Sequence, residues 1–314
     1  MNMLGRPLFH LVPHGTHIQF MRGRFAGLIT SAVLSIASLI LFLHPGLTLG
    51  LDFRGGIVVE AQTAGPANFA KIREELTRAN LSAAGLQQFG GPNNVLIRLD
   101  APKENSSETT QTLINRVKKT IETSESGAKI VRADAVGASV SSELFRNGLF
   151  ALGFSLLMIM GYIWFRFEWE FALSAIITLI LDLTKAIGFL VVTHFEFDLV
   201  MVAALLTILG YSTNDKVVVY DRVRENLRKY HSMPMRQLID LSITETLSRT
   251  LATSATVFLA ALPLALFGGP SLSGFAWVML FGIVVGTSSS IFIAAPLLLF
   301  MEEGTLKRKA KKTS

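Results

Sequence analysis

Long apolar segments constrain this chain more than any other feature. Half of its 314 residues are hydrophobic and only 17% are charged, and a soluble protein of this length is rarely so apolar. Six segments are close to the roughly 20 residues that a helix needs to cross a hydrocarbon core of about 30 Å. They are Phe25–Leu43, Gly148–Phe165, Phe171–Thr193, Leu199–Tyr220, Leu247–Phe267 and Phe275–Phe300. The sequence therefore predicts an α-helical polytopic membrane protein with six transmembrane helices.

The first apolar segment follows Arg22 and Arg24, as the apolar region of a secretory signal peptide often follows basic residues. It is longer than such a region and lacks a small-residue cleavage site, so we interpret it as a retained membrane anchor.

Basic residues orient the predicted spans. Lys and Arg are concentrated before the first span, in the turn at Arg166, in the loop at about 222–246 and in the tail 301–314, whereas the turns 194–198 and 268–274 contain none. The positive-inside rule then places both termini in the cytoplasm and residues 44–147 in the periplasm. The predicted domains are a cytoplasmic amphipathic N-terminus (1–24), a first span (25–43), a periplasmic domain (44–147), a bundle of five spans (148–300) and a basic cytoplasmic tail (301–314).

Several kinds of chemistry are excluded or unsupported. The chain has no Cys, which rules out disulfides and thiolate chemistry. We find no Walker A sequence, Rossmann glycine pattern or His-x-x-x-His helix, so no nucleotide or zinc site is indicated. The net charge of +6 comes from basic blocks beside apolar segments, which fits membrane orientation better than nucleic-acid binding. We therefore expect no enzyme activity, metal or cofactor.

The segment 44–147 predicts a separate α+β domain. The stretch "LDFRGGIVVEAQ" indicates a strand entered through a bend at Gly55-Gly56, and "PANFAKIREELTRAN" indicates a helix starting near Pro66. Strands "LQQFG" and "NVLIRLD", a helix near Ser107–Glu122 and a strand "AKIVRADAVG" follow. This β-α-β-β-α-β order is typical of the ferredoxin-like fold. We interpret the domain as a docking or substrate-contacting module without catalysis.

Charged and amide side chains inside the predicted spans are the strongest candidates for function. A charge at the bilayer centre costs on the order of 2.5–3.5 kcal/mol, so such residues persist where they pair, line a cavity or carry ions. The fourth span contains Asn214, Asp215 and Lys216, the fifth begins near Arg249, and the third contains Asp182 and Lys185.

Helical geometry indicates which of these groups can act together. Asp215 and Arg249 have similar expected depths and could meet if their spans are neighbours, forming a proton relay or a static ion pair. Asp182 and Lys185 lie three residues apart and can pair, either structurally or as an accessory relay. Lys216 points about 100° away from Asp215, and we expect it to snorkel toward the cytoplasmic face. Gly282, Gly286 and Ser290 form a small-residue seam suited to helix packing.

Several motifs resemble the SecF family, the smaller partner of SecD in bacterial protein export. "LVPHGTHIQFMRGR" is similar to the lead-in of that family, and "LGLDFRGG" contains its motif after the first span, Asp52, Phe53, Arg54, Gly55 and Gly56. "GYSTNDKVVVYDRVREN", "ETLSRTLATSAT" and "FGIVVGTSSSIFIAAPLL" resemble its most specific membrane motifs. The resemblance runs almost from end to end.

The resemblance implies one half of an RND-like transporter, which uses the proton-motive force to promote export of unfolded preproteins across the bacterial cytoplasmic membrane. It also implies a six-span SecD-like partner and the SecYEG translocon. It places the relay on Asp215 and Arg249, with Asn214 beside them. The family commonly has Thr or Ser where this chain has Lys216, and Lys185 also departs from the pattern. The resemblance makes H⁺ the expected coupling ion, and these two departures leave Na⁺ open as the alternative.

Two other functions fit the same spans. An RND-type proton-coupled exporter of lipids or small molecules would need a roomy external cavity and would work without SecD. A non-transporting assembly scaffold would tolerate simultaneous charge-neutral replacement of Asp215 and Arg249.

Overall fold

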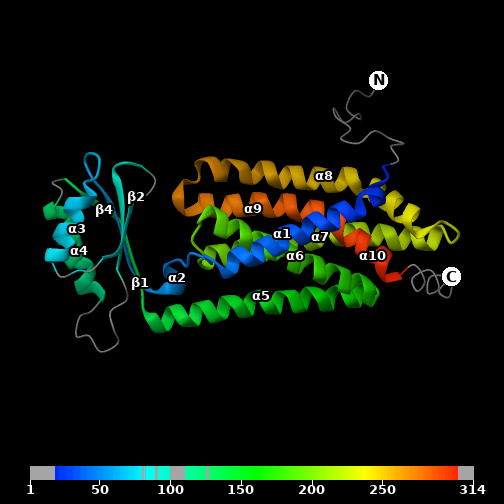
Figure 1. The fold of residues 1–314 in the computed structure, drawn as a ribbon, viewed down its shortest axis with the longest axis horizontal. Coiled ribbons are helices and arrows are strands. Elements are labelled where there is room, and N and C mark those ends of the chain that lie inside the picture. The colour runs from blue at the N-terminus through cyan, green and yellow to red at the C-terminus, as the bar shows by residue number, and fades with distance from the viewer. Residues whose placement is uncertain are drawn as a thin grey trace, which may run out of the picture.

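The computed structural model describes residues 18–79, 81, 83–88, 91–99, 110–124 and 127–302. Most of the predicted N-terminal lead-in, the first residues of the helix expected at Ser107–Glu122 and nearly all of the basic tail lie outside the described residues. Figure 1 shows a sheet domain at one end of an elongated helical bundle. The start of the first long helix and the end of the last helix both lie at the opposite end of the bundle.

The sheet domain has the predicted order of strands and helices. Its strands pair only antiparallel, in the order β2-β3-β1-β4. Helix α3 begins at Phe69, three residues after Pro66, because the Asn68 side chain caps it by accepting from the Lys71 backbone N–H at 3.2 Å. The elements are β1 Gly56–Gln62, α3 Phe69–Arg78, β2 Ala83–Gln88, β3 Asn94–Leu99, α4 Thr110–Ser124 and β4 Lys129–Val136.

Alternation along the central strands builds the core of this domain. Ile57 and Val59 of β1 and Val95 and Ile97 of β3 point to the same buried face, as the two-residue period of a strand requires. Helices α3 and α4 pack on this face (Figure 1) and add four buried apolar side chains. They are Ile72, Leu76, Val117 and Ile121.

The stretch before β1 differs from the sequence prediction. Leu51–Arg54 forms a short helix, α2, and the strand begins only at Gly56. Gly55 and Gly56 have φ values of 73° and 119°, which glycine adopts at little cost and other residues rarely adopt. A Cβ on Gly55 would also lie 3.0 Å from the Ser141 hydroxyl. The two glycines therefore let the chain turn from α2 into the sheet close to another helix.

The bundle contains the remaining helices. A π-helical segment, η2, interrupts the last long helix between α9 and α10. The elements are η1 Phe20–Gly23, α1 Arg24–Leu43, α5 Ala138–Arg166, α6 Trp169–Thr193, α7 Leu199–Lys229, α8 Met235–Phe267, α9 Gly269–Ser289, η2 Ser290–Ala294 and α10 Ala295–Glu302.

Five helical stretches in the described part of the chain are long and apolar enough to cross a membrane. Helix α7, which contains the predicted fourth span, is not among them, because its second half carries many charged residues. Helices α5 and α8 begin well before the apolar segments predicted at Gly148 and Leu247, at Ala138 and Met235. The five stretches are Phe20–Leu43, Ala138–Arg166, Trp169–Thr193, Met235–Phe267 and Leu272–Met301.

Helix α7 packs against α5, α6, α8 and α9. One apolar cluster surrounds its N-terminal part near Leu205, and a second surrounds its C-terminal part near Tyr220. Between them α7 buries Ser212, Asp215 and Lys216. A layer of polar side chains therefore separates two apolar clusters, and the candidate site lies in this layer.

Candidate functional site in the polar layer of the bundle

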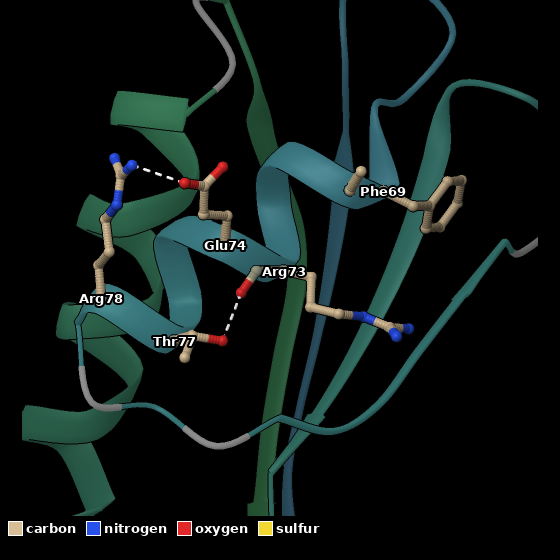
Figure 2. Close-up of a pocket in the computed structure, with 6 residues that line it drawn as sticks. Phe69, Arg73, Glu74, Thr77 and Arg78 are labelled. Carbon is tan, nitrogen blue, oxygen red and sulfur yellow. Dashed lines mark hydrogen bonds and ion pairs between the residues drawn. The ribbon is translucent and has the colours of Figure 1, made fainter.

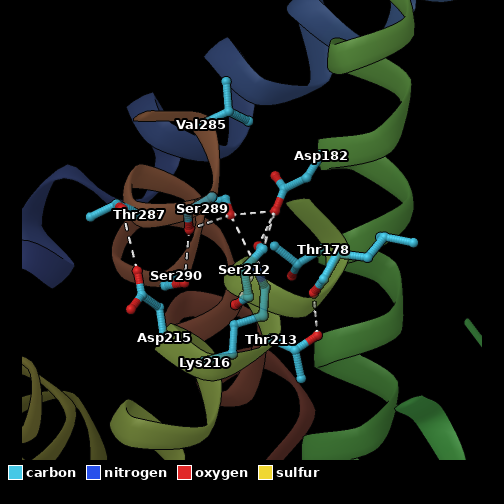
Figure 3. Close-up of polar contacts among 12 residues, drawn as sticks. Thr178, Asp182, Ser212, Thr213, Asp215, Lys216, Val285, Thr287, Ser289 and Ser290 are labelled. Atoms are coloured by element: carbon cyan, nitrogen blue, oxygen red, sulfur yellow. Dashed lines mark hydrogen bonds and ion pairs between the residues drawn. The ribbon is translucent and has the colours of Figure 1, made fainter. Parts of the chain in front are cut away.

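Asp182 is the centre of a buried cluster between α6, α7 and α9 (Figure 3). Its side chain is 1% exposed, and its Oδ2 accepts from Lys216 Nζ at 3.1 Å. Its Oδ1 accepts from Lys185 Nζ at 3.4 Å. The hydroxyls of Ser212 and Ser289 also donate to Oδ2, at 2.9 and 2.6 Å. One carboxylate therefore faces two ammonium groups and two hydroxyls.

Lys216 does not snorkel toward the cytoplasm, so that expectation is wrong. Its side chain is fully buried and donates to Asp182, and it also contacts the hydroxyls of Ser212 and Ser289. The helical turn that directs Lys216 away from Asp215 directs it toward α6 and α9. Asp182 of α6, Ser289 of α9 and Ser212 of α7 itself supply three acceptors for the three donors of this ammonium group.

Asp215 lies in a different network of side chains. It is 1% exposed, and its Oδ2 accepts from the Thr287 hydroxyl of α9 at 3.2 Å. Thr287 and Ser254 of α8 are 2.7 Å apart, and the Tyr211 hydroxyl donates to Ser254 at 2.7 Å. A chain of three hydroxyls thus links the carboxylate to α7, α8 and α9.

Arg249 and Asn214 lie beside this layer rather than within it. Both are exposed, and both line a cavity of about 980 Å³ between the second half of α7 and the first half of α8. Within the described residues, the guanidinium of Arg249 forms no ion pair with Asp215 or any other carboxylate. Helices α7 and α8 are therefore neighbours, as a contact between Asp215 and Arg249 requires. The static Asp215–Arg249 ion pair, one of the two alternatives from the sequence, is not present in this structure.

The small-residue seam of the last long helix faces α7. A Cβ on Gly282 would overlap the Ile208 side chain, and one on Gly286 would lie 3.1 Å from Ser212 Cβ. Ser290 donates to the Gly286 carbonyl at 2.9 Å and begins the π-helical segment. The close approach places Ser289 within reach of Asp182.

The motif after the first span joins the sheet domain to the start of α7. Asp52 Oδ2 accepts from the Leu199 backbone N–H at 3.1 Å, and Asp198 Oδ1 accepts from that of Met201 at 2.9 Å. Phe53 packs against Phe145 and Phe197, with ring centroids 5.4 and 5.2 Å apart. Two carboxylates therefore cap one helix N-terminus, where negative charge is stabilised by the helix dipole.

Burial and the neighbouring Asp52 carboxylate affect the ionisation of Asp198. Burial raises the pKa of its carboxyl above the ordinary value, and the nearby Asp52 carboxylate acts in the same direction. The hydrogen bond from the Met201 backbone opposes this shift.

A second connection joins the sheet to the α6–α7 turn. Arg98 of β3 forms an ion pair with Glu196 in that turn. Burial lowers the pKa of the Arg98 guanidinium, and the Arg54 charge adds to this effect. Arg54 itself is exposed.

An open depression of about 710 Å³ lies on the outer side of α3 in the sheet domain (Figure 2). Its side chains bond along their own helix: Arg78 pairs with Glu74 at 2.6 Å, and Thr77 donates to the Arg73 carbonyl at 2.7 Å. These local bonds explain the polar groups there without a ligand.

Four hydroxyls of the polar layer were absent from the sequence prediction. Ser212, Ser254, Thr287 and Ser289 all lie inside apolar helices, where a small hydroxyl residue is ordinary. Their spacing provides one signal in retrospect. Ser212 lies four residues before Lys216 and three before Asp215, so the three side chains share neighbouring faces of one helix.

The fold and this layer define a multi-pass helical membrane protein with a sheet domain between its first two long helices. The family model for the protein export membrane protein SecD/SecF, C-terminal, matches residues 116–304, and the SecD/SecF GG motif matches residues 40–67. The chain belongs to the SecD/SecF family.

Curated relatives of nearly the same length are protein translocase subunits. SecF of Rickettsia rickettsii is 40% identical over 95% of this chain and 96% of its own length. SecF of Rhodobacter capsulatus is 37% identical over 96% of this chain and 93% of its own length. SecDF of Brucella abortus is 44% identical, and the match covers 92% of this chain but only 38% of that longer protein.

Two solved structures have the same fold. The crystal structure of SecDF, a translocon-associated membrane protein from Thermus, matches with a TM-score of 0.82 and 28% identity, covering 92% of this chain and 39% of the SecDF chain. SecDF in a super-membrane-facing form matches with a TM-score of 0.65 and 28% identity, covering 98% and 41%.

Proposed function

We propose that this chain is the SecF-type subunit of a protein translocase and that it couples the proton-motive force to preprotein export through Asp215. The proposal includes six spans, with α7 as the fourth. It also places both termini in the cytoplasm and a ferredoxin-like domain in the periplasm. The basic residues in the short segments at the end of the bundle away from the sheet support this orientation.

The contrast between two buried carboxylates carries the proposal. Asp182 lies between two ammonium groups, which compensate its charge in the bundle. Asp215 is equally buried, but its described partner is a hydroxyl, and an ionised group with so little compensation is costly inside a membrane. Asp215 is therefore the buried carboxylate better suited to exchange a proton.

Arg249 and Asn214 complete the proposed relay from the adjoining cavity. Since the guanidinium of Arg249 has no carboxylate partner among the described residues, a shift of α8 against α7 could bring it toward Asp215. A cation that approaches and leaves Asp215 would alternately favour its ionised and its protonated form. Moving one charge through the field provides about 2.3 kcal/mol per 100 mV.

A second six-span subunit of the SecD type is the proposed partner, together with SecYEG and an unfolded preprotein. The match to a SecF-sized portion of longer SecDF proteins supports this pairing. We propose no cofactor, no hydrolytic site and no nucleic-acid partner, with H⁺ as the coupling ion and Na⁺ as the alternative.

Replacing Asp215 by Asn tests the proposal. Export stimulated by the proton-motive force, measured in inverted vesicles or spheroplasts, should be lost while membrane insertion remains intact. Asp134→Asn is the control, because Asp134 lies in β4 of the sheet domain, does not line this cavity and pairs with Arg132; it should retain stimulation. Full stimulation by the Asp215→Asn variant would refute the relay. Imposing a proton or a sodium gradient separately identifies the coupling ion.

A further inference from the structure

The cavity that Arg249 lines carries an excess of positive charge, of which the proposed relay uses only Arg249. Its lining comes from the end of α5, the second half of α7 and the first half of α8. Six of the lining side chains are cationic and three are anionic. Ligand cavities commonly measure about 300–1,000 Å³, so one of about 980 Å³ can hold a small charged group and its neighbours.

All three carboxylates of the cavity form ion pairs with just two arginines, Arg166 and Arg222. Asp221 pairs with Arg166 at 3.0 Å. Glu225 and Glu245 both pair with Arg222, each at 2.6 Å. These pairings leave the remaining cations of the cavity without an ion-pair partner.

Four cations remain: Arg224, Arg228, Lys229 and Arg249. In the part of the chain that the structure describes, none of them has a carboxylate within 4 Å. Arg224 donates from Nη1 to the Arg166 carbonyl at 3.2 Å, but its Nε is buried without a hydrogen-bond partner. A buried donor of this kind costs about 1–3 kcal/mol unless an acceptor satisfies it.

The depth of the cavity points to the source of that acceptor. Exposed aromatic side chains flank Arg166 where α5 ends and α6 begins: Trp164 is 64% exposed, Phe165 95% and Trp169 51%. Large aromatic residues at the ends of spans lie at the level of lipid headgroups. The guanidinium groups of Arg166 and Arg224 lie 5.0 and 5.9 Å from the ring of Phe167.

We propose that this cavity binds the phosphate of an anionic phospholipid headgroup. Guanidinium groups recognise phosphate oxygens through charge-assisted hydrogen bonds, and basic pockets between membrane helices bind lipid headgroups. A phosphate in the cavity would face Arg224 and Arg228, while the acyl chains would extend over the exposed apolar surface of α5. The inference depends neither on proton coupling nor on the orientation of the chain in the membrane.

The test measures binding of fluorescent phosphatidylglycerol and fluorescent phosphatidylcholine to the full chain in neutral-lipid nanodiscs. Wild type should prefer phosphatidylglycerol. Arg228→Gln should weaken phosphatidylglycerol binding about fivefold, the effect expected for one interfacial basic residue, and leave phosphatidylcholine binding unchanged. Arg236→Gln is the matched control, because Arg236 is exposed in the first turn of α8 and does not line the cavity. It should change binding less than twofold.

Three results would overturn the inference. Equal binding of the two lipids, or equal losses of binding in the Arg228→Gln and Arg236→Gln variants, would mean that the cavity contains no specific headgroup site. Displacement of phosphatidylglycerol by inorganic phosphate at equal concentration would assign the cavity to a free anion. A fluorescence-detected melting profile like that of wild type would show that the Arg228→Gln chain is folded.

Discussion

Replacing Asp182 by Asn is expected to destabilise the bundle more than removing either lysine that binds it. The change keeps the shape of the side chain and removes the carboxylate that forms ion pairs with both Lys185 and Lys216. Both lysines are nearly or fully buried, at 6% and 0% exposure. The variant would therefore leave two buried ammonium groups without an ion-pair partner among the described residues.

The magnitude follows from the geometry. At the 3.1 Å separation of Lys216 and Asp182, Coulomb's law gives about 5 kcal/mol of attraction at an effective dielectric constant of about 20. Desolvation offsets part of this, and breaking one partner from a buried ion pair typically costs about 3–5 kcal/mol. Lys216→Met should cost only about 1–3 kcal/mol, because Asp182 keeps Lys185 and two hydroxyls.

Replacing the whole cluster provides the sharpest comparison. A triple variant, Asp182→Leu with Lys185→Met and Lys216→Met, should recover most of the stability lost by Asp182→Asn, because apolar residues often replace buried ion pairs without loss. The free energy of unfolding can be measured by titration with SDS in mixed micelles. The fluorescence of Trp164, Trp169 and Trp277 reports the transition. A loss below about 1 kcal/mol for Asp182→Asn, or a triple variant no better than the single one, would refute this account of the charges.

Two further predictions concern packing and pH. Gly282→Ala should destabilise the α7–α9 contact by about 1–3 kcal/mol in the same SDS titration, because its Cβ would overlap Ile208. The control is Gly161→Ala on α5, whose Cβ would meet nothing within 4 Å and which should be neutral or slightly stabilising. The pKa of Asp198 in the folded protein is raised above the ordinary 3.8, so its contribution to stability is fully present below about pH 4 and is lost as pH rises through the raised pKa. Asp198→Asn, which can still cap α7, should remove this dependence of the free energy of unfolding on pH. An unchanged pH dependence in unfolding titrations of the variant across that range would contradict the assignment.

The sequence was informative where one physical pattern dominates. The stretch "LDFRGGIVVEAQ" predicts a strand entered through a bend at Gly55-Gly56, and β1 begins at Gly56. Apolar length alone located most of the membrane helices. It could not give their true starts, because α5 and α8 begin in polar stretches, where apolar length gives no signal.

The candidate site was only partly predictable, since helix partners decide what a polar residue does. The three-residue spacing of Asp182 and Lys185 indicates a local pair, and the structure contains one. Nothing local to "NDKVVV" indicates that Lys216 reaches a carboxylate 34 positions earlier in the chain. The same limit applies to Arg249, because similar depth in the membrane does not determine which way its side chain points.

The two carboxylate networks converge on one short stretch of α9. Thr287 binds Asp215, and Ser289, two residues later, binds Asp182. The π-helical segment begins at the next residue, Ser290, and such segments alter the rotation of the helix that contains them and often occur at functional sites. A small rotation at this point would change the hydroxyl contacts of Asp182 and Asp215 together. Under the proposed function, a change of protonation at Asp215 that released Thr287 would therefore also move Ser289, which donates a hydrogen bond to Asp182. Under the proposed function, this arrangement would give α9 a physical route for converting the exchange of one proton into movement between α6 and α7.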